Sequence, residues 1–256
     1  MRADSAGVLR FRRGVPACAA LAGAVAFCAT LACEDKKGEP ATEPAASDAR
    51  LDAARKLVGD FESRLSALYA AVTKGDAGAS LPPCGADSFA ALDGGDGRLL
   101  LAESEFLERY ARPSADPYAG ARARWRFLTT PALRAMPAPS RQVDESKLTE
   151  AAWNVKKLRQ TYAYLGVVHV TARKPPRLQG EQYQAGELAA RIMVAPLKGG
   201  DPICRIDVQA QSSDGVAGVE GQSREDALWN NYVLEIRKAI EGAVSGASRA
   251  VSVELG

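Results

Sequence analysis

The chain has 256 residues, of which 46% are hydrophobic and 25% charged, and its formal net charge is +2 at pH 7. The 32 residues before Cys33 contain four arginines and one aspartate, a net charge of +3, so the remainder is near −1. A near-neutral chain of this size can bury a substantial core. It is a poor candidate for general nucleic-acid binding, which depends on neutralising phosphates, and we expect no nucleic-acid partner.

An uncharged, alanine-rich segment runs from Gly14 to Ala32, with arginines before it and Cys33 directly after it. A basic start, an apolar stretch and small residues before a cut are the parts of a secretory signal. Residues 30–33, Thr-Leu-Ala-Cys, resemble the lipobox of bacterial lipoprotein precursors. The resemblance implies that residues 1–32 are a removed signal peptide and that Cys33 is lipidated, for example with palmitate. The lipid would anchor the chain to a cell-envelope membrane, facing the periplasm.

Two other interpretations of this segment stay open. The apolar run from Val15 to Ala32 has 18 residues, near the lower limit for spanning a bilayer, so it could be an uncleaved anchor. It could also be a plain signal cut near Ala32. All three interpretations place residues 34–256 outside the cytoplasm. Glu34 favours the outer membrane, since an aspartate at that position marks retention in the inner membrane of enteric bacteria.

Five cysteines are present, but Cys18 and Cys28 lie in the signal segment and Cys33 is the expected anchor. Cys84 and Cys204 remain. Two cysteines in an oxidising compartment usually pair, so we expect a disulfide, with two separate buried thiols as the alternative. One histidine and no close cysteine pair argue against a zinc site, and we expect no metal and no cofactor.

After the signal segment we expect the lipidated cysteine and a flexible tether over residues 33–49, because these residues lack large apolar side chains. Residues 50–256 are expected to form a single α+β domain. Its first helix, capped by Ser47 or Asp48, runs to about Lys74, because apolar residues repeat every three or four positions. Residues 75–97 are rich in Gly, Pro and Asp and predict an ordered loop held by Cys84. A short helix follows from Glu103 to Tyr110.

Seven arginines but only one acid, Asp116, lie between Arg109 and Arg141. The alternation over residues 121–127 predicts a strand with three arginines on one face, although a helix stays open. These are Arg122, Arg124 and Arg126. Guanidinium groups bind carboxylates and phosphates, so the three are a candidate surface for an anionic envelope component. An ordinary solvated face is the alternative.

Residues 131–139 contain three prolines and predict a loop, and a helix starting at Asp144 or Ser146 includes Leu158. Three strands follow, rich in β-branched residues, at Tyr162–Ala172, Glu187–Leu197 and Ile203–Gln211. They are expected to form an antiparallel meander. In the third strand apolar and polar residues alternate, so one face should pack on helices while the other contacts water or a partner.

Ser223 and Asp226 resemble a capping box at the start of a helix with an apolar stripe that includes Tyr232. Alternation over residues 251–255 predicts a short edge strand. The expected fold class is therefore α+β: a small antiparallel three-stranded meander, extended to four or five strands at most, packed on helices.

The only histidine, His169, could act as a general base. Its neighbours are apolar and no motif serine or cysteine accompanies it, so a structural role is favoured. The sequence also contains no nucleophile elbow, metal constellation or phosphate loop.

We therefore expect a non-enzymatic lipoprotein that binds or scaffolds an envelope protein or an anionic envelope component, through the exposed sheet face or the arginine-rich region. The alternative is an envelope hydrolase or transferase whose site is assembled from scattered residues. A deep pocket on which His169, Asp207 or a glutamate converges would favour the enzyme. A shallow polar sheet face would favour the binding module.

Overall fold

The computed structural model describes residues 43–74, 78–90, 97–112, 127–128, 130–180, 182–213, 221–248, 251–253 and 255. The chain divides into two units, Met1–Ala41 and Thr42–Gly256, and every described residue belongs to the second. The predicted signal segment and Cys33 lie outside the described residues. None of the helices in the described ranges is both long and apolar enough to cross a membrane.

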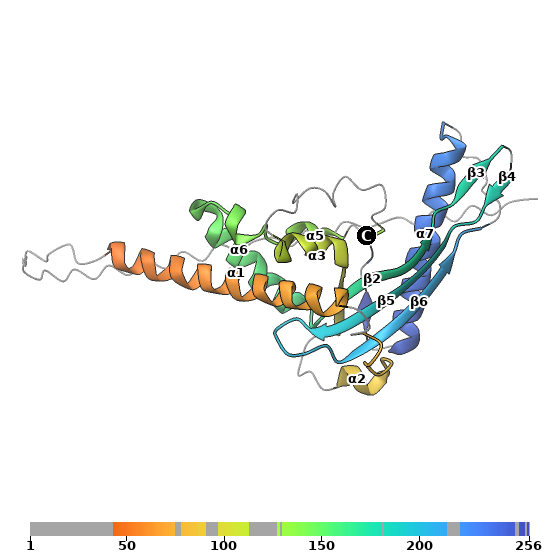
Figure 1. Cartoon of the computed structure of the whole chain (residues 1–256). Coiled ribbons are helices and arrows are strands. Elements are labelled where there is room, and N and C mark those ends of the chain that lie inside the picture. Colours follow the sequence, from red (N-terminus) through yellow and green to blue (C-terminus); the bar gives the residue numbers. More distant parts are fainter. Residues whose placement is uncertain are drawn as a thin grey trace, which may run out of the picture. The chain divides into compact units, whose positions relative to one another are not determined.

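The longer helices expected from the sequence are present with shifted boundaries, and among the described residues short helices also form within the segments 75–97 and 131–139, which are expected to be loops (Figure 1). The described helices are α1 (Glu43–Thr73), α2 (Ala86–Ala90), α3 (Ser104–Ala111), α5 (Pro131–Ala135), the 3-10 helix η2 (Ser140–Gln142), α6 (Glu145–Thr161) and α7 (Arg224–Ala247). Because α1 begins at Glu43, residues 43–49 are helical rather than part of a flexible tether. Alanine and glutamate are good helix formers and extend α1 beyond the expected cap. Thr130 caps α5 inside the segment expected to be a loop.

The strands form a five-stranded sheet in the order β6-β5-β2-β1-β7 and a separate β3–β4 hairpin. Their bounds are β1 (Arg98–Glu103), β2 (Tyr164–Lys174), β3 (Arg177–Gln179), β4 (Gln182–Gln184), β5 (Glu187–Pro196), β6 (Cys204–Gln211) and β7 (Ser252–Val253). The α+β class is confirmed. The small three-stranded meander is not, because β1 pairs in parallel with both β2 and β7 and makes the sheet mixed. Five of the six residues of β1 are buried, so it lacks the alternation that identifies an amphipathic strand.

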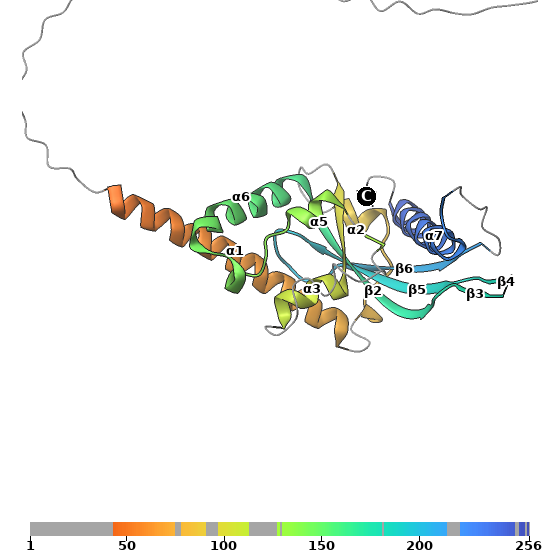
Figure 2. The ribbon, with the colours of Figure 1, turned by 90° about the horizontal axis from the view of Figure 1, so that it is seen from above.

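The two faces of the sheet are covered differently, as Figure 2 shows. Helix α7 packs along one face with an apolar stripe that includes Tyr232, Ile236 and Ile240. Helices α1 and α3 contact β2 on the other side. The first five residues of β2 are buried, whereas its last four, Thr171–Lys174, are exposed. We call the side away from α7 the opposite face; it is covered at the start of β2 and uncovered at its end.

Residues 78–84, which we call the clasp, cross the outer edge of β6. An added Cβ at Gly78 would lie 2.9 Å from Arg191 Cδ, on the opposite face. The Arg205 N–H donates to Pro82 O (2.9 Å) and the Cys84 N–H donates to Arg205 O (2.8 Å). Cys84 is then bonded to Cys204, which shares the buried side of β6 with Ile206.

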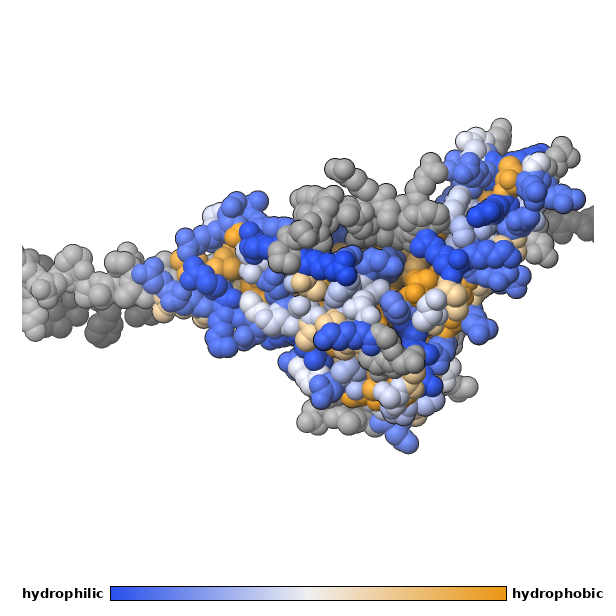
Figure 3. All heavy atoms as spheres, viewed as in Figure 1, coloured by the Kyte–Doolittle hydropathy of each residue, from blue (hydrophilic) through white to orange (hydrophobic). Residues whose placement is uncertain are grey.

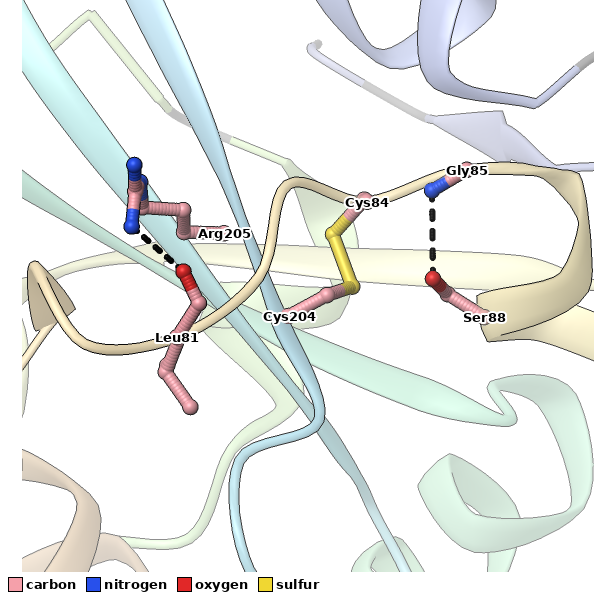
Figure 4. The surroundings of a disulfide bond; sticks show 6 residues. All are labelled: Leu81, Cys84, Gly85, Ser88, Cys204 and Arg205. Atoms are coloured by element: carbon pink, nitrogen blue, oxygen red, sulfur yellow. Dashed lines mark hydrogen bonds between the residues drawn. A yellow bond between two sulfur atoms is a disulfide. The ribbon is translucent and has the colours of Figure 1, made fainter.

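The predicted Cys84–Cys204 disulfide is thus present, and it joins residues 120 positions apart (Figure 4). The Arg205 guanidinium donates to the carbonyl oxygens of Ala79 and Leu81. The disulfide and these hydrogen bonds together fix the clasp on the edge strand.

Replacing both cysteines, Cys84→Ala with Cys204→Ala, should lower the free energy of unfolding by about 5 kcal/mol, because the cross-link closes a long loop in the unfolded chain. Urea denaturation followed by circular dichroism measures the change. A thiol reductant should lower the stability of the wild-type chain to that of the variant and leave the variant unchanged. Equal stabilities of oxidised wild type and variant would contradict the prediction.

Candidate functional site

A row of polar side chains crosses the opposite face of the sheet where its helical cover ends. In the strand register His169 stands beside Arg191, and Arg191 stands beside Asp207. Directly paired residues of neighbouring strands project from the same face. Ser104, which follows the last residue of β1, completes the row by contacting His169. We call Ser104, His169, Arg191 and Asp207 the polar row.

Ser104 is the histidine partner that sequence reasoning missed. Its Oγ lies 3.2 Å from His169 Nδ1 and 3.4 Å from Glu105 Oε2. A serine beside a histidine is the arrangement of an activated nucleophile, but Ser104 is only 3% exposed. A substrate therefore cannot reach its hydroxyl in this conformation. The contact instead orients the imidazole, and the structural role of His169 stays a prediction.

The far end of the polar row is an ion cluster in which two guanidinium groups share one carboxylate. Asp207 Oδ1 lies 3.0 Å from Arg191 Nε, and Asp207 Oδ2 lies 3.2 Å from Arg205 Nε. Burial alone would raise the pKa of Asp207, but the hydrogen bonds and positive charges of the two arginines outweigh it and hold that pKa below its ordinary value. Asp207 is consequently ionised at neutral pH, and the cluster has a net charge of +1.

Beyond the polar row, a hollow of about 560 Å³ opens at the ends of β2, β5 and β6. Its floor on the opposite face is a row of paired residues, Ala172, Ala189 and Gln209. The Lys174–Glu187 ion pair (3.2 Å) stands at its far side. Neither His169 nor Asp207 lines this hollow. Figure 3 shows this side of the molecule, where hydrophilic residues predominate around the strand ends.

Only part of the arginine-rich region, residues 109–141, lies among the described residues. Arg122, Arg124 and Arg126 lie outside the described residues, so their role as an anion surface stays a prediction. Arg141 donates to Arg109 O (2.6 Å) and Arg112 O (2.9 Å) at the end of α3. These carbonyls have no partner within the helix, so Arg141 has a structural role at the C-terminal end of α3.

The comparisons with known proteins do not indicate a function for this chain. No protein-family model matches the chain, and neither a curated protein nor a solved structure matches it. Within the described ranges, no group of three or more His, Cys, Asp or Glu side chains could hold a metal ion. What the site offers chemically is a set of partly buried guanidinium groups beside exposed amide and carboxylate groups, around small side chains.

Asp207→Asn should lower the melting temperature at pH 7, because the amide loses the charge that both arginines contact. A carboxyl whose pKa is depressed by folding stabilises the protein above its unfolded pKa, and this stabilisation disappears as the pH falls through the folded pKa. The difference between wild type and variant should therefore shrink below pH 3.8, the ordinary value for this group.

Calorimetry at pH 7 and at the lowest pH where both proteins stay folded measures the two differences. Asp60→Asn is the matched control, since among the described residues Asp60 pairs with Lys56 alone, one helical turn away on the exposed surface of α1. A pH-independent difference for Asp207→Asn would contradict the assigned charge cluster.

Proposed function

We propose that the protein is a lipoprotein of the cell envelope, anchored through Cys33, whose periplasm-facing domain binds a partner rather than catalysing a reaction. The observation that supports binding is the uncovered opposite face, where the polar row borders an open hollow. A polar surface of this kind is what we expect of a binding module. The outer membrane is the favoured location.

The chemistry of this face suits a polar or anionic partner. Arg191 uses its Nε for Asp207, and the described residues give its terminal nitrogens no hydrogen-bond acceptor. A second carboxylate could therefore bind there and balance the net charge of the cluster. The small floor residues, Ala172 and Ala189, let a partner chain approach the sheet closely. An envelope protein or an anionic envelope component fits these properties.

Catalysis has weaker support. The contact between Ser104 and His169 is the observation that would favour an envelope hydrolase, but it involves a buried hydroxyl. A nucleophile must reach its substrate to act. We therefore favour binding over hydrolysis or group transfer.

A further observation supports the envelope location. The Cys84–Cys204 disulfide agrees with export, because such bonds persist in oxidising compartments.

Cys33→Ser should abolish palmitate labelling and release the protein from the membrane fraction, because the serine cannot accept the lipid. Metabolic labelling with an alkynyl palmitate, followed by fractionation and immunoblotting, measures both. Cys28→Ser is the control and should keep the label. Labelling that survives Cys33→Ser would exclude Cys33 as the anchor.

A photoreactive amino acid at Ala189, in the floor of the hollow, should cross-link the partner in intact cells. The same amino acid at Lys56, on the exposed surface of α1, is the control and should give no such adduct. Adding Arg191→Gln should weaken the Ala189 adduct about tenfold or more, because a charged hydrogen bond contributes about 1.5–3 kcal/mol. An adduct of equal strength from both positions, or none from Ala189, would contradict binding at this face.

A further inference from the structure

Strand β6 is the outermost strand on its side of the sheet, and only part of its edge is paired. Both backbone groups of Arg205 point outward to the clasp. Because the backbone groups of a strand alternate between its two sides, those of Asp207, Gln209 and Gln211 point outward as well. The described residues provide no hydrogen-bond partner for these outward groups. We call residues 207–211 the open window.

Both ends of the open window are defined by contacts. At one end the clasp occupies the edge beside Arg205. At the other end Ser212 N–H donates to Gly186 O (2.9 Å) on the β5 side, and the next N–H, that of Ser213, is occupied by Asn231 Oδ1 (3.1 Å). The window contains no lysine and no proline, the residues that commonly protect an exposed edge from pairing.

We propose that a second copy of this chain pairs with the open window, giving a two-fold dimer in which the two β6 strands run antiparallel. Centring the axis on Gln209 places Gln209 opposite its own copy. It also places Asp207 of each copy opposite Gln211 of the other, which makes three residue pairs. Each pair exchanges two backbone hydrogen bonds, about six in total. The two sheets thereby become one continuous sheet.

The side chains of the window favour a second copy as the occupant. In this register the Asp207 carboxylate faces the Gln211 amide of the other chain, which can donate a hydrogen bond to it. The two Gln209 amides can bond each other, and no like charges stand opposite. Beyond Gln211 of the second copy, the Ser213 N–H is already bonded to Asn231 Oδ1 of its own α7, so the strand pairing of this register ends where the clasp begins.

The test uses the lipidated chain isolated from membranes in detergent, with its mass measured by analytical ultracentrifugation and corrected for bound detergent. The wild-type chain should sediment as a dimer. Gln209→Pro should sediment as a monomer, because proline removes an outward N–H at the centre of the interface without removing a bond to β5. Gln209→Ala keeps that N–H and is the matched control, which should remain a dimer.

Cysteine cross-linking tests the register and does not depend on the proline variant folding. Under mild oxidation Gln209→Cys should form a disulfide-linked dimer, since the two Cα atoms would be about 5.5 Å apart, within disulfide range. Asp207→Cys should remain uncross-linked, because its own copy would lie four residues away along the strand. A wild-type chain that stays monomeric at every concentration, or equal cross-linking at both positions, would overturn the dimer. Binding of an unrelated peptide to a monomeric chain would do so as well.

Discussion

The structure depends on the way Arg205 joins the edge of the sheet to the clasp. Its backbone groups pair with Pro82 and Cys84, its guanidinium holds two clasp carbonyls, and its Nε contacts Asp207. The adjacent residue, Cys204, forms the disulfide. One strand position thus fixes where the chain goes after α1, completes the charge cluster and sets one end of the open window. The buried disulfide and the proposed binding surface are therefore neighbours on β6.

Elements with a clear period could be predicted from the sequence. The starts of α6 and α7 and the ranges of β2, β5 and β6 agree within a few residues, and Ser223 accepts the Asp226 N–H (3.1 Å) as the capping pattern predicts. Strand β1 could not be predicted, because a strand buried on both faces shows no alternation. The close packing of β1 on β2 could not be predicted either. It requires a glycine at position 166, where an added Cβ would lie 2.5 Å from Leu101 Cδ2. Only the folded sheet reveals that this glycine lets β1 and β2 pack closely.

The site was predictable only in outline. Alternation in β6 correctly indicated which residues are exposed, and the cysteine count indicated the disulfide. The contact of Ser104 with His169 joins residues 65 positions apart, so no local sequence pattern predicts it. A register shift between Val170 and Ala172 changes which later residues of β2 project into the hollow. A bulge of this kind reverses the alternation downstream of it, so Ala172 and Lys174, rather than Arg173, stand on the opposite face.

The proposed dimer would place the proposed binding faces of its two copies side by side. An axis that relates two antiparallel edge strands through a hydrogen-bonded pair runs perpendicular to the sheet, so it keeps the opposite face of both copies on the same side. The two charge clusters and the two hollows would then share one continuous surface, with the glutamines of the paired windows between them. A partner with two anionic groups could bind both copies at once, and the second contact would be intramolecular. Modest binding at each shallow hollow would in that case be enough for stable attachment.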